Sequence, residues 1–253
     1  MGHLQDLQSS WDEFGRIDPL WAVATDPSKK GNKWSPEEFF TRGIEEIDTL
    51  VADLENLGIT IHRRRALDFG CGVGRLTQAL ARHFDTVVGV DIAPSMIEQA
   101  RKFNRFGDRC TYSVNSAANL RMFKDETFDL VYTSYVLQHI QPAYAKTYIK
   151  EFLRVLAPDG LLVFLTLSTK ATFWGDLYYD VRYPLNKLYA RAYKRIKGPI
   201  MESHFMRHSE LLQLLEANEA KAIDVTTIKD TPYWSGSRYC VVKASRPHQS
   251  SRH

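Results

Sequence analysis

The stretch Ala66-Leu67-Asp68-Phe69-Gly70-Cys71-Gly72-Val73-Gly74-Arg75-Leu76 decides the fold of this chain. Three glycines alternate with single residues directly after a short apolar run, and a helical pattern of apolar residues follows at once. The pattern predicts a buried strand, a tight glycine turn and a helix whose first N–H groups are free to bind a ligand. Glycine permits positive φ and lets a ligand approach the backbone closely. The turn alone does not identify the ligand, because many nucleotides bind at such turns.

Two features narrow the choice of ligand. The glycine spacing is G-x-G-x-G, whereas dinucleotide enzymes, which bind a pyrophosphate at the helix N-terminus, carry G-x-G-x-x-G. The carboxylate of Asp68, just before the turn, would repel a phosphate and suit an ammonium group. Residues 86–91 predict a second strand that ends in Asp91, where a ribose diol is bound in such folds. A ribose and an ammonium group without a phosphate indicate S-adenosyl-L-methionine.

Two later stretches, residues 127–132 and 156–162, complete the pattern. Together with the glycine turn and the strand ending at Asp91, they resemble the class I S-adenosylmethionine-dependent methyltransferases over residues 64–168, in that family's order and spacing. The resemblance implies an enzyme that transfers a methyl group from this cofactor. The alternative is another nucleotide-binding fold with a chance D-x-G-x-G-x-G.

The resemblance also implies which residues bind the cofactor. In family members the loop after the third strand often supplies an acid to the adenine, but this chain has Ser116 and Ala117 there, which leaves the backbone, Asn115 or Asn119 for that contact. Residues 133–135, after the fourth strand, would lie beside the methionine half. The predicted cofactor-binding residues are Asp68, Gly70, Cys71, Gly72, Val73, Gly74, Asp91, Ile92, Ser116, Ala117, Thr133 and Tyr135.

Strand and helix patterns alternate along the chain and predict an α/β fold with helices on both faces of a parallel sheet. We expect a Rossmann-like, doubly wound, mostly parallel sheet of seven strands; the resemblance adds that the last strand is antiparallel. A helical cap is expected after strand five. Predicted helices cover residues 36–58, 94–100, 142–156 and 209–217, with another opening at 137–139; predicted strands after the first cover 86–91, 110–114, 128–134, 160–167, 222–228 and 238–243.

We expect a single methyltransferase domain over residues 1–253. The aromatic residues Trp11, Phe14, Trp21 and Trp34 argue against a free N-terminal tail; the segment either braces the main domain or forms a lid over the cofactor cleft. The expected divisions are residues 1–60 (N-terminal lid and helix), 64–168 (cofactor-binding core), 169–207 (substrate cap), 208–245 (C-terminal helix and strands) and 246–253 (polar tail).

The predicted cap is longer than a strand–helix loop requires and leaves from the carboxyl end of a strand, where open parallel sheets bind ligands. Its aromatic side chains predict a substrate-binding surface that includes Trp174, Tyr178, Tyr179 and Tyr183. Residues 185–197 have helical periodicity and a basic face, which is a solvated surface, a contact for an anionic substrate, or a contact for a membrane surface or nucleic acid. The Asn/Asp-Pro-Pro-Tyr tetrapeptide of methyltransferases that modify bases is absent from the sequence, so nucleic-acid substrates are not favoured.

The composition is that of an ordinary globular protein: 44% hydrophobic and 25% charged residues, with a net charge of +3 that does not indicate nucleic acid. Three scattered cysteines fit neither a disulfide framework nor a metal site, and Asp176 and Asp180 alone do not indicate a metal. We therefore expect no metal. With no signal-like segment or apolar span in the sequence, we expect a cytoplasmic location. The oligomeric state is left open.

Methyl transfer from a sulfonium requires alignment and exclusion of water, and a hydroxyl acceptor also needs a base. His139, His204 and His208 are the candidates, each with a structural role as the alternative. We predict O-methylation of a small molecule, or of a saccharide or glycolipid, in biosynthesis. One alternative is a methyltransferase acting on protein or RNA. Another is a non-catalytic partner subunit with the same fold, against which the intact glycines and acids argue.

Overall fold

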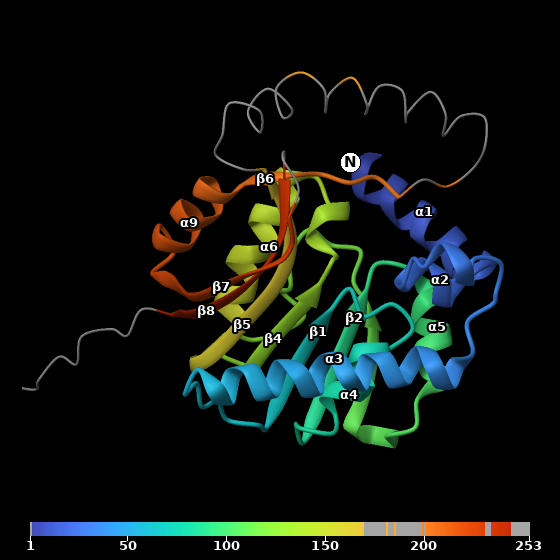
Figure 1. Cartoon of the computed structure of the whole chain (residues 1–253), viewed down its shortest axis with the longest axis horizontal. Helices are drawn as coiled ribbons and strands as arrows, with labels where there is room; N and C mark the ends of the chain where they lie inside the picture. The colour runs from blue at the N-terminus through green and yellow to red at the C-terminus, as the bar shows by residue number, and fades with distance from the viewer. Residues whose placement is uncertain are drawn as a thin grey trace, which may run out of the picture.

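The computed structural model describes residues 2–169, 201–230 and 234–243, together with Val181, Leu185 and Pro199 (Figure 1). The predicted substrate-binding aromatics of the cap, its basic helix and the C-terminal tail lie outside the described residues. Within the described ranges, no helix combines the length and the apolar character needed to cross a membrane.

A mixed sheet forms the centre of the protein (Figure 1). Neighbouring strands follow the order β3-β2-β1-β4-β5-β8-β7, and β6 pairs with the end of β5. The pairs from β3 to β5 are parallel, whereas β8 is antiparallel to both β5 and β7. The strands are β1 Arg65–Phe69, β2 Thr86–Asp91, β3 Cys110–Val114, β4 Phe128–Ser134, β5 Leu156–Thr169, β6 Met206–Arg207, β7 Ala220–Asp230 and β8 Trp234–Lys243. This architecture confirms the predicted fold class.

The sheet differs from the sequence prediction in several details; β7 and β8, for example, are longer than the predicted strands 222–228 and 238–243. The two-residue strand β6 was not predicted, because its pairing with Ser168 and Thr169 is set by tertiary structure. Strand β5 begins at Leu156 rather than at residue 160, and its register against β4 shifts between Phe128 and Leu130. The irregular pairing explains how Pro158 and Gly160, residue types that are unfavourable inside a regular strand, lie within β5.

Helices cover both faces of the sheet. On one face, α3, α4 and α5 pack on residues such as Ala66 and Leu130; on the other, α6 and α9 pack on residues such as Leu67 and Val131. Figure 1 shows α3 and α4 crossing one face. The helices are α1 Gly2–Ile17, α2 Pro19–Val23, η1 Pro27–Lys29, α3 Pro36–Asn56, α4 Arg75–Leu80, α5 Pro94–Phe103, η2 Gly107–Arg109, η3 Leu137–His139, α6 Pro142–Val155 and α9 His208–Glu216.

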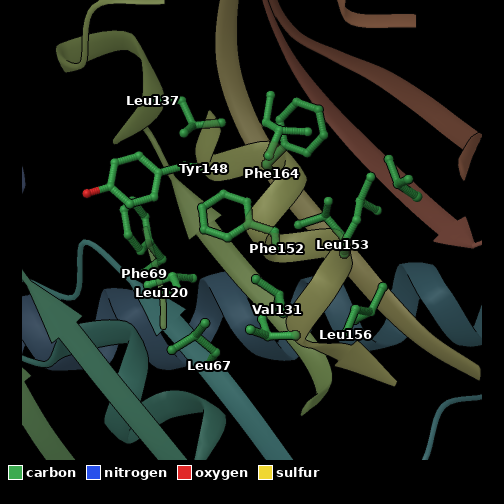
Figure 2. Packing of buried hydrophobic residues seen from close by; sticks show 14 of the residues in the cluster. Leu67, Phe69, Leu120, Val131, Leu137, Tyr148, Phe152, Leu153, Leu156 and Phe164 are labelled. Atoms are coloured by element: carbon green, nitrogen blue, oxygen red, sulfur yellow. The ribbon is translucent and has the colours of Figure 1, made fainter. Parts of the chain in front are cut away.

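Aromatic packing fixes α6 against the sheet (Figure 2). The ring of Phe69, the last residue of β1, lies 4.6 Å from the ring of Tyr148 and 4.9 Å from that of Phe152, centroid to centroid. Phe152 is fully buried, and Tyr148 reaches past the core to donate a hydrogen bond to the carbonyl of Ala117 at 2.5 Å. Burying rings of this size is the main apolar contribution to such a core. It also holds the carboxyl end of β1 in place.

The N-terminal helices dock on the same end of the sheet. Gln8 donates to the carbonyl of Ile92 at 2.9 Å, and the Asp12 carboxylate accepts from the backbone N–H of Ser95 at 2.8 Å. The hydroxyl of Ser95 donates to the carbonyl of Asp12 at 2.8 Å. Helix α1 is thereby attached to the start of α5, directly after the acid that ends β2.

Candidate active site

A cavity of about 760 Å³ lies where β1, β2 and β4 end. From β1 the chain adds β2 and β3 on one side, and then β4 and β5 on the other side. The strand order thus reverses between β1 and β4, and ligands of open α/β sheets bind at such a switch point. The walls come from the glycine loop, the ends of β2 and β4, and helices α1 to α3. The predicted site residues that line it are Gly70, Gly72, Asp91, Ile92, Tyr135 and His139.

The three glycines of the loop all have positive φ, at +75° for Gly70, +52° for Gly72 and +83° for Gly74. A Cβ on Gly70 would lie 2.3 Å from Val136, and one on Gly72 would lie 2.4 Å from Val23 of α2. The glycines were predicted to admit a ligand; they are also needed because other parts of the protein approach the loop this closely.

Asp91 connects the loop to the end of β2. One carboxylate oxygen accepts from the N–H of Gly72 and the other from the N–H of Ala93, both at 2.9 Å. Burial raises the pKa of Asp91, and these backbone hydrogen bonds oppose the rise. Each carboxylate oxygen keeps a further lone pair, so the group is able to accept from a diol at the cavity wall.

Asp68 lies beneath the loop and not among the residues that line the cavity. It is 2% exposed, and its carboxylate accepts from the hydroxyl of Thr77 at 2.6 Å. Burial raises its pKa to about 7. Cys71 and Val73 are also buried and lie outside the cavity lining. The predicted contact of Asp68 with an ammonium group stays a prediction.

Asn115, one of the residues considered for the adenine contact, lies at the cavity. Its backbone N–H donates to the carbonyl of Asp91 at 2.8 Å, its side chain donates to the carbonyl of Asn119 at 3.1 Å, and it lines the cavity. Ser116 and Ala117 are exposed and lie outside the cavity lining. Of the residues considered in place of the missing acid, Asn115 is the one that lines the cavity, whereas Asn119 does not.

Strand β4 ends in a strained turn. Tyr135 has a φ of +58°, which is uncommon for a bulky side chain, and it lines the cavity together with Ser134. This conformation turns the chain so that Val136 covers Gly70. Thr133 is fully buried and lies outside the cavity lining.

His139 is the candidate base that reaches the cavity. Its Nδ1 lies 2.7 Å from the carbonyl oxygen of Glu202, an acceptor, so Nδ1 carries the proton and Nε2 is the acceptor nitrogen. The side chain of Gln138 approaches Nε2 at 3.4 Å, and the ring of Trp11 packs edge-on at 5.2 Å. Burial lowers the pKa of His139, which favours the neutral imidazole.

The other two histidines do not line the cavity. His204 is 2% exposed, and its backbone N–H donates to the carbonyl of Gln138 at 2.6 Å. His208 approaches the hydroxyl of Tyr239 through Nδ1 at 2.6 Å. Neither lines the cavity, so the geometry favours His139 among the three predicted bases.

Sequence reasoning missed four charged residues that line the cavity, Asp26, Arg42, Glu46 and Arg75. Of these, Glu46 of α3 and Arg75 at the start of α4 form an ion pair at 2.8 Å. The signal was Gly43, a glycine inside a long helix. A Cβ there would lie 2.6 Å from the Cγ of Arg75. Because glycine is unfavourable within a helix, its presence indicates a close approach of another part of the chain.

Residues 67–164 match a family model that is described as a methyltransferase domain. A ubiquinone biosynthesis O-methyltransferase of Bartonella tribocorum is 30% identical over 249 residues, covering 91% of this chain and 91% of that protein. The chain belongs to the class I S-adenosylmethionine-dependent methyltransferases.

Further relatives of this methyltransferase agree with the assignment. A protein with the same name from Bartonella bacilliformis is 28% identical over 236 residues, covering 91% of this chain and 90% of its own. The solved magnesium protoporphyrin IX methyltransferase of Synechocystis is 20% identical, with 94% and 98% of the two chains covered and a TM-score of 0.60. A geranyl diphosphate C-methyltransferase of Streptomyces coelicolor is 14% identical, with 96% and 98% covered and the same TM-score of 0.60. The two structures show the fold alone.

The cofactor of this methyltransferase is S-adenosyl-L-methionine, and the residues at the cavity suit its parts. Asp91 offers acceptors for a ribose diol, and Asn115 offers a polar edge for the adenine. The glycine loop lines the cavity through Gly70 and Gly72. Within the described parts of the chain, no group of three or more His, Cys, Asp or Glu side chains is arranged to hold a metal ion.

Proposed function

We propose that this methyltransferase methylates a hydroxyl oxygen of a small molecule and that His139 accepts the hydroxyl proton. The observation that carries the proposal is the hydrogen bond between Nδ1 of His139 and the carbonyl of Glu202, at 2.7 Å. It fixes the tautomer in which Nε2, on a side chain that lines the cavity, is the proton acceptor.

The cofactor supplies a methyl group on a sulfonium that is already activated. The chain then has to bind the acceptor beside it, exclude water and remove the proton from the hydroxyl. A lowered pKa keeps His139 neutral, as a base must be before it accepts a proton. The weak contact from Gln138 at 3.4 Å is one that an acceptor hydroxyl would replace.

Two further observations support a small hydroxyl acceptor. The relatives reported above are named as O-methyltransferases of ubiquinone biosynthesis. Apolar side chains, among them Trp11, Val136, Ile140 and Leu167, form much of the cavity wall near His139. Such a wall favours an acceptor with an apolar body over one that is polar throughout. Within this function, a saccharide or glycolipid remains a candidate acceptor. Binding of the acceptor by the aromatic residues of the predicted cap is likewise a proposal.

The acceptor class is tested with methyl-tritiated S-adenosylmethionine and four separate acceptor sets: hydroxylated aromatics, saccharides, total protein and total RNA. We expect label in a small-molecule product that survives mild alkali, as a methyl ether does and a methyl ester does not. Label confined to protein or RNA would overturn the proposal in favour of the macromolecular alternative. A chain that binds S-adenosylhomocysteine and labels none of the four sets would also contradict it.

The role of His139 is tested by His139→Gln, which keeps a donor for the Glu202 carbonyl and removes the base. With the acceptor found above, we expect kcat to fall by about 10²–10⁴-fold with little change in cofactor affinity. Because burial lowers the pKa of His139, wild-type kcat/KM should rise through an acidic pKa and be level at neutral pH. The control is His83→Gln. His83 is partly buried, its Nε2 lies 2.6 Å from a carboxylate oxygen of Asp48, and it does not line the cavity. Equal kcat in both variants would exclude His139 as the base.

A further inference from the structure

Four polar side chains from three elements meet at one wall of the cavity. One carboxylate oxygen of Glu46, on α3, accepts from the hydroxyl of Tyr132 at 3.0 Å and from that of Ser134 at 3.1 Å. The other accepts from the guanidinium of Arg75 at 2.8 Å. Glu46, Arg75 and Ser134 line the cavity, and Tyr132 is buried behind them. This group is called the Glu46 cluster below.

Packing and hydrogen bonds hold the cluster behind its cavity-facing side. The stem of Arg75 passes over Gly43, and its guanidinium lies 5.8 Å from the centre of the Phe39 ring. The Arg75 side chain is 12% exposed, and its Nε is buried with no hydrogen-bond partner among the described residues. Burial and the nearby Glu46 carboxylate raise the pKa of Tyr132, so this hydroxyl stays a donor. Both charges are thus fixed in position before any ligand binds.

The motif acid offers a poorer partner for the cofactor's ammonium group. Asp68 is 2% exposed, lies outside the cavity lining, and already accepts from Thr77. Burial raises its pKa to about 7, so much of it carries no charge at neutral pH. Glu46, in contrast, has a side chain that is 32% exposed and reaches the cavity.

We infer that the Glu46 cluster binds the amino-acid end of S-adenosylmethionine: the carboxylate of Glu46 receives the ammonium group, and the guanidinium of Arg75 receives the carboxylate. Ser134, at the end of β4, orients the Glu46 carboxylate. The inference rests on the use of this cofactor by the family and not on the acceptor or the base proposed above.

The chemistry of the pair matches a zwitterion. The cofactor's amino-acid end carries one positive and one negative charge on neighbouring atoms, and an ion pair at the cavity wall presents the complementary charges side by side. Hydrogen bonds with a charged partner are stronger than neutral ones. An ion pair that only tied α3 to α4 would not need to face the cavity.

The test measures binding by calorimetry with three ligands. S-adenosylhomocysteine carries the whole amino-acid end, decarboxylated S-adenosylmethionine lacks the carboxylate, and 5′-methylthioadenosine lacks both groups. Glu46→Gln keeps hydrogen-bonding atoms for Tyr132 and Ser134. This variant should lower the affinity for the first two ligands at least about tenfold and leave the affinity for the third within about twofold of the wild type. Arg75→Gln should lower the affinity for S-adenosylhomocysteine more than the affinity for the two ligands that lack a carboxylate.

Matched controls are Glu45→Gln, an exposed neighbour on the same helix, and Arg82→Gln, an exposed arginine just beyond α4. Both should bind all three ligands like the wild type. Equal weakening of all three ligands in the cluster variants would show a merely structural role and overturn the inference. The inference would also be overturned if Glu46→Gln left the affinity for all three ligands unchanged while Asp68→Asn lost affinity only for the two ligands that carry the amine. If the wild type bound none of the three, the cofactor assignment itself would fail.

Discussion

Asp91 has both carboxylate oxygens engaged by the backbone, at Gly72 and at Ala93, and it still faces the cavity. The ribose contact proposed for it would add hydrogen bonds to a charged group. We expect Asp91→Asn to weaken binding of S-adenosylhomocysteine by about 1.5–3 kcal/mol, measured by calorimetry. Asp108→Asn, at an exposed position in η2, is the control. A dissociation constant close to that of the wild type would argue against the ribose role.

Asp68 gives a stability prediction whose sign follows from its raised pKa of about 7. An aspartate in the unfolded chain has a pKa near 3.9, so between these values the folded state binds more protons than the unfolded state. The free energy of unfolding of the wild type relative to Asp68→Asn should therefore fall as pH rises, by up to about 1.4 kcal/mol per pH unit, and level off above pH 7.

Urea unfolding of both proteins at pH 5, 6, 7 and 8 measures this difference. Asp85→Asn, at an exposed position, should show no such trend. A wild-type-to-variant difference that stays constant from pH 5 to pH 7 would show that Asp68 is ionised throughout, and the Asp68 carboxylate would again compete with Glu46 for the amine.

At the residue scale, the predicted site residues that lie at the cavity are those that belong to a local sequence pattern. Gly70, Gly72, Asp91 and Tyr135 all line the cavity, because each stands at or directly after the end of a strand. Glu46 could not be found in this way. It belongs to a helix outside the motif, and only the packing of α3 over Arg75 brings it to the end of β4.

At the element scale, the glycine loop and α2 depend on one another. Gly72 has a φ of +52°, and a Cβ there would lie 2.4 Å from Cγ2 of Val23. Gly72→Val should therefore displace α2 as well as strain the loop. We expect a lower melting temperature and an affinity for S-adenosylhomocysteine that is at least about tenfold lower. Thermal unfolding and calorimetry measure the two effects.

Gly107→Val is the control that separates the effect of backbone strain from the effect of a steric clash with a neighbouring element. Gly107 has a similar φ of +55°, but a Cβ there would meet nothing within 4 Å among the described residues. This variant should lose some stability from backbone strain and keep its cofactor affinity. Equal cofactor affinity in the Gly72 and Gly107 variants would show that the loop is not part of the site.

Elements with their own sequence pattern were predicted well, and those set by contacts were not. The Ser35-Pro36 start of α3 has a hydroxyl that accepts from Glu38 and a proline in the first turn, both readable from the sequence. The stretch after β4 was expected to open a helix but forms the short η3, Leu137–His139. Pro142 starts α6 afresh, which limits η3 to a single turn.

At the scale of the whole molecule, the sheet order could be expected from the family resemblance, whereas the position of the N-terminal segment could not. The aromatics of that segment left two interpretations open, a brace and a lid. In the structure, Asp12 attaches α1 to α5, and Trp11 lines the cavity beside His139. The role of the segment as a lid stays a prediction. Periodicity predicts that such a helix has an apolar face, but not which surface it covers.

The central claim is that one cavity binds the cofactor between the glycine loop, Asp91 and the Glu46 cluster. A crystal structure of the chain grown with S-adenosylhomocysteine tests it most directly. We predict the ribose hydroxyls on Asp91, the ammonium group on Glu46 and the carboxylate on Arg75. Nucleoside bound outside this cavity would contradict the cofactor site, and an ammonium group bound to Asp68, with Glu46 and Arg75 paired only to each other, would contradict the assignment of the amino-acid end.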